Sequence, residues 1–217
     1  PTYLSTHQLA DLATHIYKHF IPKKDAELSV EIAPLVTDEE QLKILRECGF
    51  NRVSFGVQDF DANVQALLNR RQSVSATHRL IDFTRRMGFT SVNVDLIYGL
   101  PEQTRNSCAQ TIQTIIELRP DRIACYSYAY VPWLKKPQKV TRAQLPSPEE
   151  KLAIWLNTIN QLIQAGYQYI GLDHFALPDD NLAQAQFNGT LTRNFQGYST
   201  LEECDIYGFG LSAISSV

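Results

Sequence analysis

Residues 91–98 read Ser-Val-Asn-Val-Asp-Leu-Ile-Tyr and lead directly into the chain breaker Gly99-Leu100-Pro101. An almost continuous apolar run of this length is typical of a parallel strand that is buried on both faces. The polar residues Asp95 and Tyr98 come shortly before the breaker, so we expect them near the carboxyl end of the strand. The stretch therefore predicts a strand of an α/β protein with polar groups at its exit.

The same order of strand, polar exit and helix recurs along the chain. Apolar runs predict strands over 27–32, 52–57, 91–98, 123–131 and 167–173, with a further strand-like run over 208–215. Helical periodicity predicts helices over 5–20, 38–48, 61–68, 75–87, 104–118 and 149–165. A long connection runs from Pro132 to Pro148, and the region after Pro178 is polar and rich in Asn and Gln. Strands that alternate with helices at this spacing favour βα units and a mostly parallel sheet.

The composition excludes several classes of protein. Apolar residues make up 44% and charged residues 20% of the 217 residues, which excludes collagen-like, low-complexity and disordered chains. The formal net charge is -3, whereas proteins that bind nucleic acids or acidic membranes usually have an excess of basic residues. No run approaches the roughly 20 apolar residues of a spanning helix, and the cysteines are spaced too widely for a disulfide scaffold. We therefore expect a cytoplasmic protein with no nucleic-acid partner and no membrane partner.

Each of the apolar runs that predict strands ends, at its C-terminal side, in a polar group, and a breaker follows most of these groups. They are Glu31, Gln58-Asp59, Asp95, Tyr128-Ala129-Tyr130 and Asp173-His174. Because ligands of parallel α/β proteins bind at the carboxyl ends of the strands, this pattern predicts one site at one edge of the sheet. The alternative for each single residue is that it only marks the point where a strand leaves the core.

Two pairs of residues allow two interpretations each. Asp173-His174 supplies either a general acid, base or metal ligand, or merely a histidine that orients a loop. Arg70-Arg71 either binds a carboxylate or forms the solvated end of a helix. The sequence has no nucleophile elbow, phosphate-binding loop or HExxH helix, so hydrolase, NTPase and zincin activities lack support.

Longer runs are more specific than these single residues. Residues 49–60 read Gly-Phe-Asn-Arg-Val-Ser-Phe-Gly-Val-Gln-Asp-Phe, residues 93–104 read Asn-Val-Asp-Leu-Ile-Tyr-Gly-Leu-Pro-Glu-Gln-Thr, and residues 69–72 read Asn-Arg-Arg-Gln. With residues 171–176 and 193–198, they resemble the oxygen-independent coproporphyrinogen III oxidases of the radical S-adenosylmethionine (SAM) superfamily over nearly the whole chain. Gly-Val-Gln-Asp-Phe and Asn-Phe-Gln-Gly-Tyr are typical of this one family, whereas Asp-Leu-Ile-Tyr-Gly-Leu-Pro is shared with related radical enzymes.

The resemblance implies an oxidative decarboxylation in anaerobic haem biosynthesis. In this family a [4Fe-4S] cluster cleaves SAM reductively, and the resulting 5′-deoxyadenosyl radical removes a hydrogen atom from a propionate side chain. Loss of CO2 and one electron leaves a vinyl group, and two such rounds convert coproporphyrinogen III into protoporphyrinogen IX. The implied partners are two SAM molecules, this substrate and an electron donor such as flavodoxin or ferredoxin, and the full-length protein is expected to be a monomer.

The resemblance also implies roles for single residues. They are Glu31 and Ile214 for the cluster-bound SAM, Gln58, Arg70, Asp95 and Ala129 for a second SAM, and, more weakly, Gln196 for the substrate pocket. Acidic, guanidinium and amide groups suit the ammonium, carboxylate and ribose diol of the cofactor. We therefore expect Glu31, Gln58, Arg70 and Asp95 to share one cavity.

The chain departs from the family pattern where the cluster is bound. The family uses a C-x-x-x-C-x-x-C run ahead of a Gly-Gly-Thr-Pro strand, and the sequence contains neither, although Pro1-Thr2 matches the tail of that segment. We therefore expect 1–217 to be an incomplete radical-SAM core domain, truncated at both ends, without the cluster loop and the C-terminal helical domain. The predicted fold is a partial (βα)6 radical-SAM barrel that lacks its first strands and has extra strands at its C-terminal side. This piece alone is expected to be inactive.

Two other functions remain open. One is a haem-binding, chaperone-like relative on the same barrel, which a haem titration would distinguish from an oxidase. The other is an ordinary βα-barrel lyase or hydrolase whose site contains Asp173 and His174, for which the sequence offers no nucleophile or metal set. A C-x-x-x-C-x-x-C run upstream of Pro1 would decide for the radical SAM superfamily.

Overall fold

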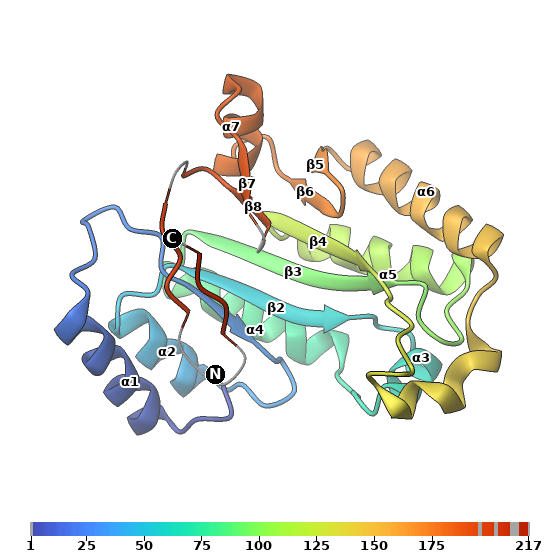
Figure 1. Cartoon of the computed structure of the whole chain (residues 1–217), viewed down its shortest axis with the longest axis horizontal. Helices are drawn as coiled ribbons and strands as arrows, with labels where there is room; N and C mark the ends of the chain where they lie inside the picture. The colour runs from blue at the N-terminus through green and yellow to red at the C-terminus, as the bar shows by residue number, and fades with distance from the viewer. Residues whose placement is uncertain (1, 195–196, 202–203, 209–212, 217) are drawn as a thin grey trace.

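The computed structural model describes residues 2–194, 197–201, 204–208 and 213–216 and has an α/β architecture (Figure 1). Its main sheet has the strand order β1-β2-β3-β4-β6-β5. The parallel strands are β1 (Ser29–Ile32), β2 (Arg52–Gln58), β3 (Ser91–Tyr98) and β4 (Arg122–Ser127). The antiparallel hairpin of β5 (Gln168–Gly171) and β6 (His174–Ala176) extends the sheet, because β6 pairs with β4.

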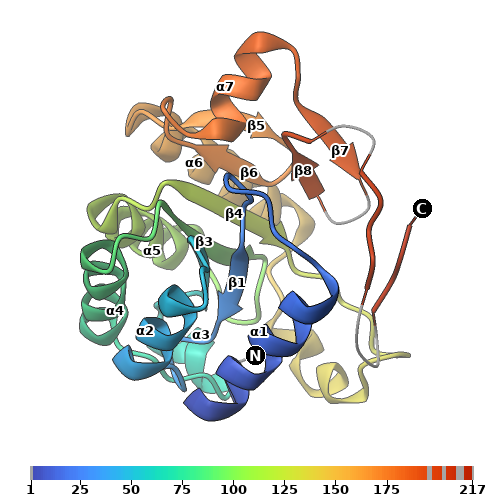
Figure 2. The ribbon, with the colours of Figure 1, turned by 90° about the vertical axis from the view of Figure 1, so that its left-hand side faces the viewer.

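Helices precede, connect and follow the parallel strands, and they cover one face of the sheet. They are α1 (Thr6–His19), α2 (Glu39–Glu47), α3 (Ala62–Leu67), α4 (Val74–Arg86), α5 (Arg105–Leu118) and α6 (Pro148–Gln164). Figure 2 shows α2, α4 and α5 on the outer side of β1, β3 and β4. Each begins close to the predicted residue; for example, Ser5 caps α1 by accepting a hydrogen bond from the backbone of Gln8 at 3.3 Å. The parallel strands and their outer helices form an open, partial βα barrel.

Side chains of the parallel strands alternate between an apolar and a polar face. Phe55 and Val94 have no exposed surface and lie in the core with residues of the helices. Ser54, Asn93 and Asp95 alternate with these core residues and point to the opposite face. The expected burial on both faces holds for the first four residues of β2, whereas Asn93 and Asp95 of β3 are only half-buried. The second face, which we call the polar face, consists of hydrogen-bonding side chains that need partners.

The sheet also differs from the prediction after α6. The single strand predicted over 167–173 is divided into β5 and β6 by a turn in which Gly171 has a φ of 138° and Leu172 a φ of 47°. Positive φ values leave the strand conformation, so the chain reverses and His174 begins a new strand. The strand predicted over 123–131 ends at Ser127.

Several elements are not predicted by the sequence pattern. They are the 3-10 helix Lys136–Gln144, α7 (Asn181–Asn188), β7 (Thr192–Asn194) and β8 (Gly197–Ser199). The apolar side of α7 is short and is built mainly from small residues such as Ala183, so its periodicity is weak among the Asn and Gln residues. Residues 209–212, half of the strand predicted over 208–215, lie outside the described part of the chain, and the described residues 208 and 213–215 are not in a strand. Among the described residues, none of the helices has the length and apolar character needed to span a bilayer.

The core position of Phe55 can be tested by truncation. Phe55→Ala should lower the free energy of unfolding by about 3–5 kcal/mol, because a buried ring is lost and a cavity remains. Phe187 is 85% exposed on α7, so Phe187→Ala, the matched control, should change it by less than about 0.5 kcal/mol. Urea unfolding followed by circular dichroism measures both values, and equal losses would contradict the assigned core.

Candidate functional site

Asp95 on β3 is the centre of a hydrogen-bond network on the polar face. Its carboxylate oxygens accept hydrogen bonds from Ser54 Oγ at 2.6 Å and from Asn93 Nδ2 at 2.8 Å. Burial raises the pKa of Asp95, the two hydrogen bonds oppose this rise, and the negative charge of Glu31 adds to it. The network holds the carboxylate in one orientation, in which it can bind a cationic group or a pair of hydroxyl groups.

Gln58 ends β2 in a left-handed backbone conformation. Its φ is 71°, and the pairing of β2 with β3 is irregular between Gly56 and Gln58. A non-glycine residue in this conformation costs about 1–3 kcal/mol and persists only where its surroundings impose it. Irregular pairing of this kind re-aims side chains next to binding sites. The Gln58 amide lies close to Gly56, where an added Cβ atom would meet Nε2 at 3.3 Å.

Arg70 reaches the same place from the loop after α3. Its Nη2 donates a hydrogen bond to the carbonyl oxygen of Gly56 at 2.6 Å. Its Nε is buried and has no hydrogen-bond partner among the described residues. A buried donor without a partner is rare in folded proteins, so this atom marks a position where a ligand oxygen could bind.

Glu31 joins this group from β1, where it pairs in register with Ser54. A cavity of about 270 Å³ is lined by Glu31, Gln58, Arg70 and Asp95, together with residues such as Thr2, Tyr3 and Ala33. The structure therefore brings these four predicted ligand residues together at one cavity. The contributing strands are β1, β2 and β3, whose carboxyl ends lie at one edge of the sheet.

Two other predicted ligand residues, Ala129 and Ile214, do not line this cavity. Ala129 follows β4, and its carbonyl oxygen accepts a hydrogen bond from Gln138 Nε2 at 3.0 Å. Ile214 is 63% exposed in the C-terminal segment. Gln196 lies outside the described residues. The roles implied for these three residues stay predictions.

Asp59 illustrates the alternative interpretation of a polar residue at a strand exit. Its carboxylate accepts hydrogen bonds from Asp61 N at 2.8 Å, Thr111 Oγ1 at 2.6 Å and Gln103 Nε2 at 2.5 Å. Burial raises its pKa, and these hydrogen bonds oppose the rise. Because its partners come from the protein itself, Asp59 holds the loop after Gln58 against α5 and is not a ligand residue.

Asp173 and His174 lie on the β6 side of the polar face. Asp173 Oδ1 is 2.6 Å from His174 Nδ1, and the His174 ring meets the Tyr126 ring edge-on at 6.0 Å. Burial raises the pKa of Tyr126 to about 12, and nearby carboxylates add to the rise. These are the carboxylates of Asp95, Asp173 and Glu31. The Tyr126 hydroxyl is therefore close enough to interact electrostatically with the carboxylates of the cavity and with that of Asp173.

The sequence analysis missed Ser54, Asn93 and Tyr126 on the polar face. Ser54 lies between Val53 and Phe55, and Asn93 lies between Val92 and Val94. This two-residue period is the signal that could have found them, because successive strand residues point to opposite faces. Reading the strands as continuous apolar runs concealed it.

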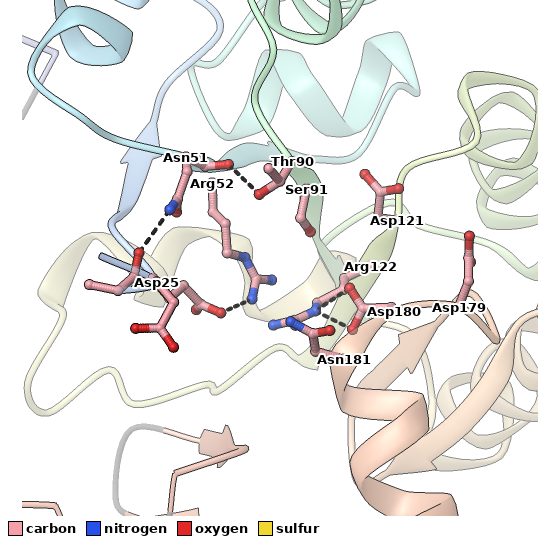
Figure 3. Close-up of a pocket in the computed structure, with 12 residues that line it drawn as sticks. Asp25, Asn51, Arg52, Thr90, Ser91, Asp121, Arg122, Asp179, Asp180 and Asn181 are labelled. Atoms are coloured by element: carbon pink, nitrogen blue, oxygen red, sulfur yellow. Dashed lines mark hydrogen bonds and ion pairs between the residues drawn. The ribbon is translucent and has the colours of Figure 1, made fainter. Parts of the chain in front are cut away.

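A second cavity, of about 410 Å³, lies at the amino edge of the sheet (Figure 3). Arg52 forms an ion pair with Glu27, and Arg122 Nε donates to both carboxylate oxygens of Asp180 at 2.7 and 2.8 Å. Arg122 and Asp180 are buried, so removal of either partner would leave an unpaired buried charge. The Arg52–Glu27 pair connects the start of β2 with the loop before β1, and the Arg122–Asp180 pair connects the start of β4 with the start of α7. Both pairs therefore have a structural role.

The cysteines do not provide an iron-sulfur site. Cys108 and Cys125 are buried, Cys48 is half-buried and Cys204 is exposed. Burial raises the pKa of Cys108 to about 12 and that of Cys125 well above its ordinary value, which disfavours the thiolate form that binds iron. Within the described ranges, no group of three or more His, Cys, Asp or Glu residues is arranged to hold a metal ion. The described residues therefore do not fit a [4Fe-4S] cluster.

Comparisons with known proteins show the family of this chain. The family model of the radical SAM superfamily matches residues 3–115. Oxygen-independent coproporphyrinogen III oxidases from Pseudomonas aeruginosa and Salmonella typhimurium are 47% and 49% identical to the chain, over 100% of it and 48% of each relative. The chain thus spans about half the length of these curated relatives.

A solved structure gives the same result. The coproporphyrinogen III oxidase of Escherichia coli, described as a radical SAM enzyme, matches with a TM-score of 0.96 and 48% identity. The match covers 99% of this chain and 50% of that one. The chain therefore belongs to the radical SAM superfamily and resembles, over its whole length, the oxygen-independent coproporphyrinogen III oxidases within it.

Proposed function

We propose that the protein is an oxygen-independent coproporphyrinogen III oxidase and that the cavity on its polar face binds SAM. The observation that carries this proposal is the meeting of Glu31, Gln58, Arg70 and Asp95 at one cavity. Similarity of the whole chain to proteins named as such oxidases supports it further. The superfamily implies a [4Fe-4S] cluster and SAM as cofactors.

The residues at the cavity fit SAM in charge and in hydrogen bonding. Asp95 and Glu31 offer carboxylates to the cationic groups of the cofactor, and the buried Nε of Arg70 offers a donor to its carboxylate. Gly56, which has no side chain, lets the Arg70 and Gln58 side chains approach the backbone closely. We propose that two SAM molecules bind, with Glu31 and Ile214 contacting one and Gln58, Arg70, Asp95 and Ala129 contacting the other.

The proposed reaction converts two propionate side chains of coproporphyrinogen III into vinyl groups. Each propionate gives up CO2, one hydrogen atom and one electron, so the reaction needs a hydrogen-atom acceptor and a one-electron acceptor. SAM, when bound, supplies the adenosyl group that accepts the hydrogen atom. The residues of this chain bind and orient the cofactor, and the hydrogen bonds from Ser54 and Asn93 keep the Asp95 carboxylate in place for this task.

Several further properties belong to this proposal. Because the described cysteines do not fit a cluster, its ligands would come from outside residues 1–217. We propose that 1–217 is an incomplete core domain that does not cleave SAM alone. The whole protein would act as a cytoplasmic monomer and take electrons from a donor such as flavodoxin or ferredoxin.

The full-length protein tests this function directly. After anaerobic reconstitution with iron, sulfide and reductant, it should convert coproporphyrinogen III into protoporphyrinogen IX only when SAM is present. Arg70→Met should weaken SAM binding about 10-fold or more, because a charge-assisted hydrogen bond contributes about 1.5–3 kcal/mol. Arg71→Met alters the exposed neighbouring arginine and should leave SAM binding unchanged. Haem binding with a Soret shift, without SAM-dependent turnover, would favour the haem-binding relative instead.

The close approach at Gly56 gives an independent test. Gly56→Ala would place a methyl group 3.0 Å from Arg70 Nη2 and 3.3 Å from Gln58 Nε2. Both side chains must then shift, and overpacking of about 1–3 kcal/mol should weaken SAM binding about 10-fold. Gly88→Ala adds a methyl group where no atom lies within 4 Å, at the amino edge of β3. The φ of 80° at Gly88 makes alanine strained there, so the variant should lose stability but keep its SAM affinity. Equilibrium dialysis with labelled SAM compares the two, and equal affinities would contradict the assigned cavity.

The raised pKa of Asp95 predicts a pH dependence. As the pH falls through this raised pKa, the buried carboxylate takes up a proton and no longer attracts a cation, so the affinity for SAM should fall. Asp95→Asn should bind SAM weakly and lack this acid step. Glu31→Gln, measured in parallel, shows how much of the pH dependence comes from the second carboxylate of the cavity. Dissociation constants measured from about pH 4.5 to 8 cover the range of shifted carboxyl pKa values. The exposed Asp25→Asn is the control, and an acid step that persists in Asp95→Asn would refute this assignment.

A further inference from the structure

The β4–β6 side of the polar face has hydrogen-bond donors that the proposed cofactor cavity does not use. The His174 side chain is 17% exposed and lies between two tyrosine rings. Tyr126 of β4 meets it at 6.0 Å and Tyr198 of β8 at 5.4 Å, both edge-on. His174 is therefore held in place on this face and is not a mobile surface side chain.

Asp173 fixes the orientation of the His174 ring. Its carboxylate can only accept, so the ring atom at 2.6 Å from Oδ1, Nδ1, must carry the proton. This hydrogen bond leaves Nε2 as the ring atom available to a ligand. An Asp–His pair of this kind is the usual way in which proteins fix the tautomer and direction of a functional imidazole.

The strand register places this imidazole beside the proposed cofactor residues. Asp95 pairs with Ala124, and Ala124 pairs with His174, so the three residues form one row across β3, β4 and β6. Ala124 contributes only a methyl group, and nothing larger stands in the row between Asp95 and His174. The positive charge of His174 accordingly lowers the pKa of Asp95, against the larger effect of burial. Tyr126 follows Ala124 by two residues and points to the same face.

The charges on this face determine which ligands can approach it. Among the described residues of this face, the carboxylates of Glu31, Asp95 and Asp173 outnumber the basic side chains of Arg70 and His174, and Arg193 lies over the neighbouring Tyr198 ring at 5.9 Å. The arginines at the amino edge of the strands, Arg52 and Arg122, are engaged in ion pairs with Glu27 and Asp180. An anionic ligand is thus repelled by this face unless a cation binds first.

We propose that His174, oriented by Asp173, binds a propionate carboxylate of the substrate together with the hydroxyl of Tyr126, and that it does so after cationic SAM has bound. This inference rests on the proposed function and deepens it, because it assigns the substrate to the β4–β6 side of the face. In its imidazolium form, His174 donates from Nδ1 to Asp173 and from Nε2 to the propionate. SAM carries two positive groups and one carboxylate, so it supplies the positive charge that the four anionic propionates of coproporphyrinogen III require.

Equilibrium binding to the full-length, cluster-reconstituted protein tests this proposal. Without reductant the ligands bind but do not react, so the affinity for coproporphyrinogen III can be measured anaerobically with and without saturating SAM. The wild-type protein should bind coproporphyrinogen III about 10-fold more tightly when SAM is present. His174→Gln should weaken that binding about 10-fold, and Asp173→Asn and Tyr126→Phe about 3- to 10-fold. All three variants should keep their SAM affinity within about 2-fold of wild type, which also shows that they are folded.

The matched control is His78→Gln. His78 also forms a pair with an aspartate, Asp82 at 3.0 Å, but on the exposed side of α4, so this variant should bind both ligands like the wild type. In turnover with reductant, His174→Gln should raise KM for coproporphyrinogen III more than it lowers kcat.

The possible results separate this inference from the proposed function. Unchanged coproporphyrinogen III binding in His174→Gln would overturn the inference and leave the oxidase assignment intact. A loss of SAM binding with unchanged coproporphyrinogen III binding would overturn it as well, by assigning His174 to the carboxylate of SAM. Failure of the wild-type protein to bind coproporphyrinogen III at all would overturn the proposed function and the inference together.

Discussion

The alternation of side chains along β2 and β3 is the constraint on which the rest of the protein depends. Successive residues of a strand point to opposite faces. The register that buries Phe55 and Val94 under the helices therefore also places Ser54 and Asp95 on the polar face. A slip of one residue would exchange the two sets and place a carboxylate in the core. The packing of the helices therefore fixes the position of the proposed site.

One of the strained backbone positions lies at the site. Gln58 has a positive φ beside the irregular pairing of β2, and the neighbouring Asp59 is tied to α5 by its buried hydrogen bonds. These bonds offset the cost of the left-handed backbone, and they hold the Gln58 side chain near Gly56 and Arg70. The hydrogen bonds of Asp59 thus help to fix the position of the proposed ligand residue Gln58.

The two edges of the sheet use charge in different ways. At the amino edge, Arg122 and Asp180 form an ion pair that joins the start of β4 to the start of α7. At the carboxyl edge and along the polar face, carboxylates such as Asp95 and Glu31 have fewer basic partners, and Arg70 keeps an unpaired buried donor. Unsatisfied charge and hydrogen-bonding capacity indicate a ligand, whereas satisfied ion pairs indicate structure. This contrast explains why the cavity of about 410 Å³ at the amino edge is not the proposed site.

The sequence by itself determined the alternation of strands and helices, most helix boundaries and the family resemblance of the runs that include Gln58, Arg70 and Asp95. These features depend on local periodicity, on capping residues such as Ser5 and on short motifs, all of which involve residues that are close together in the sequence. Only the tertiary structure decided that the run over 167–173 turns back on itself and that β6 inserts beside β4. It also decided that His174 stands in one row with Asp95. The physical reason is that strand order and register arise from contacts between residues far apart in the chain, which no local pattern specifies.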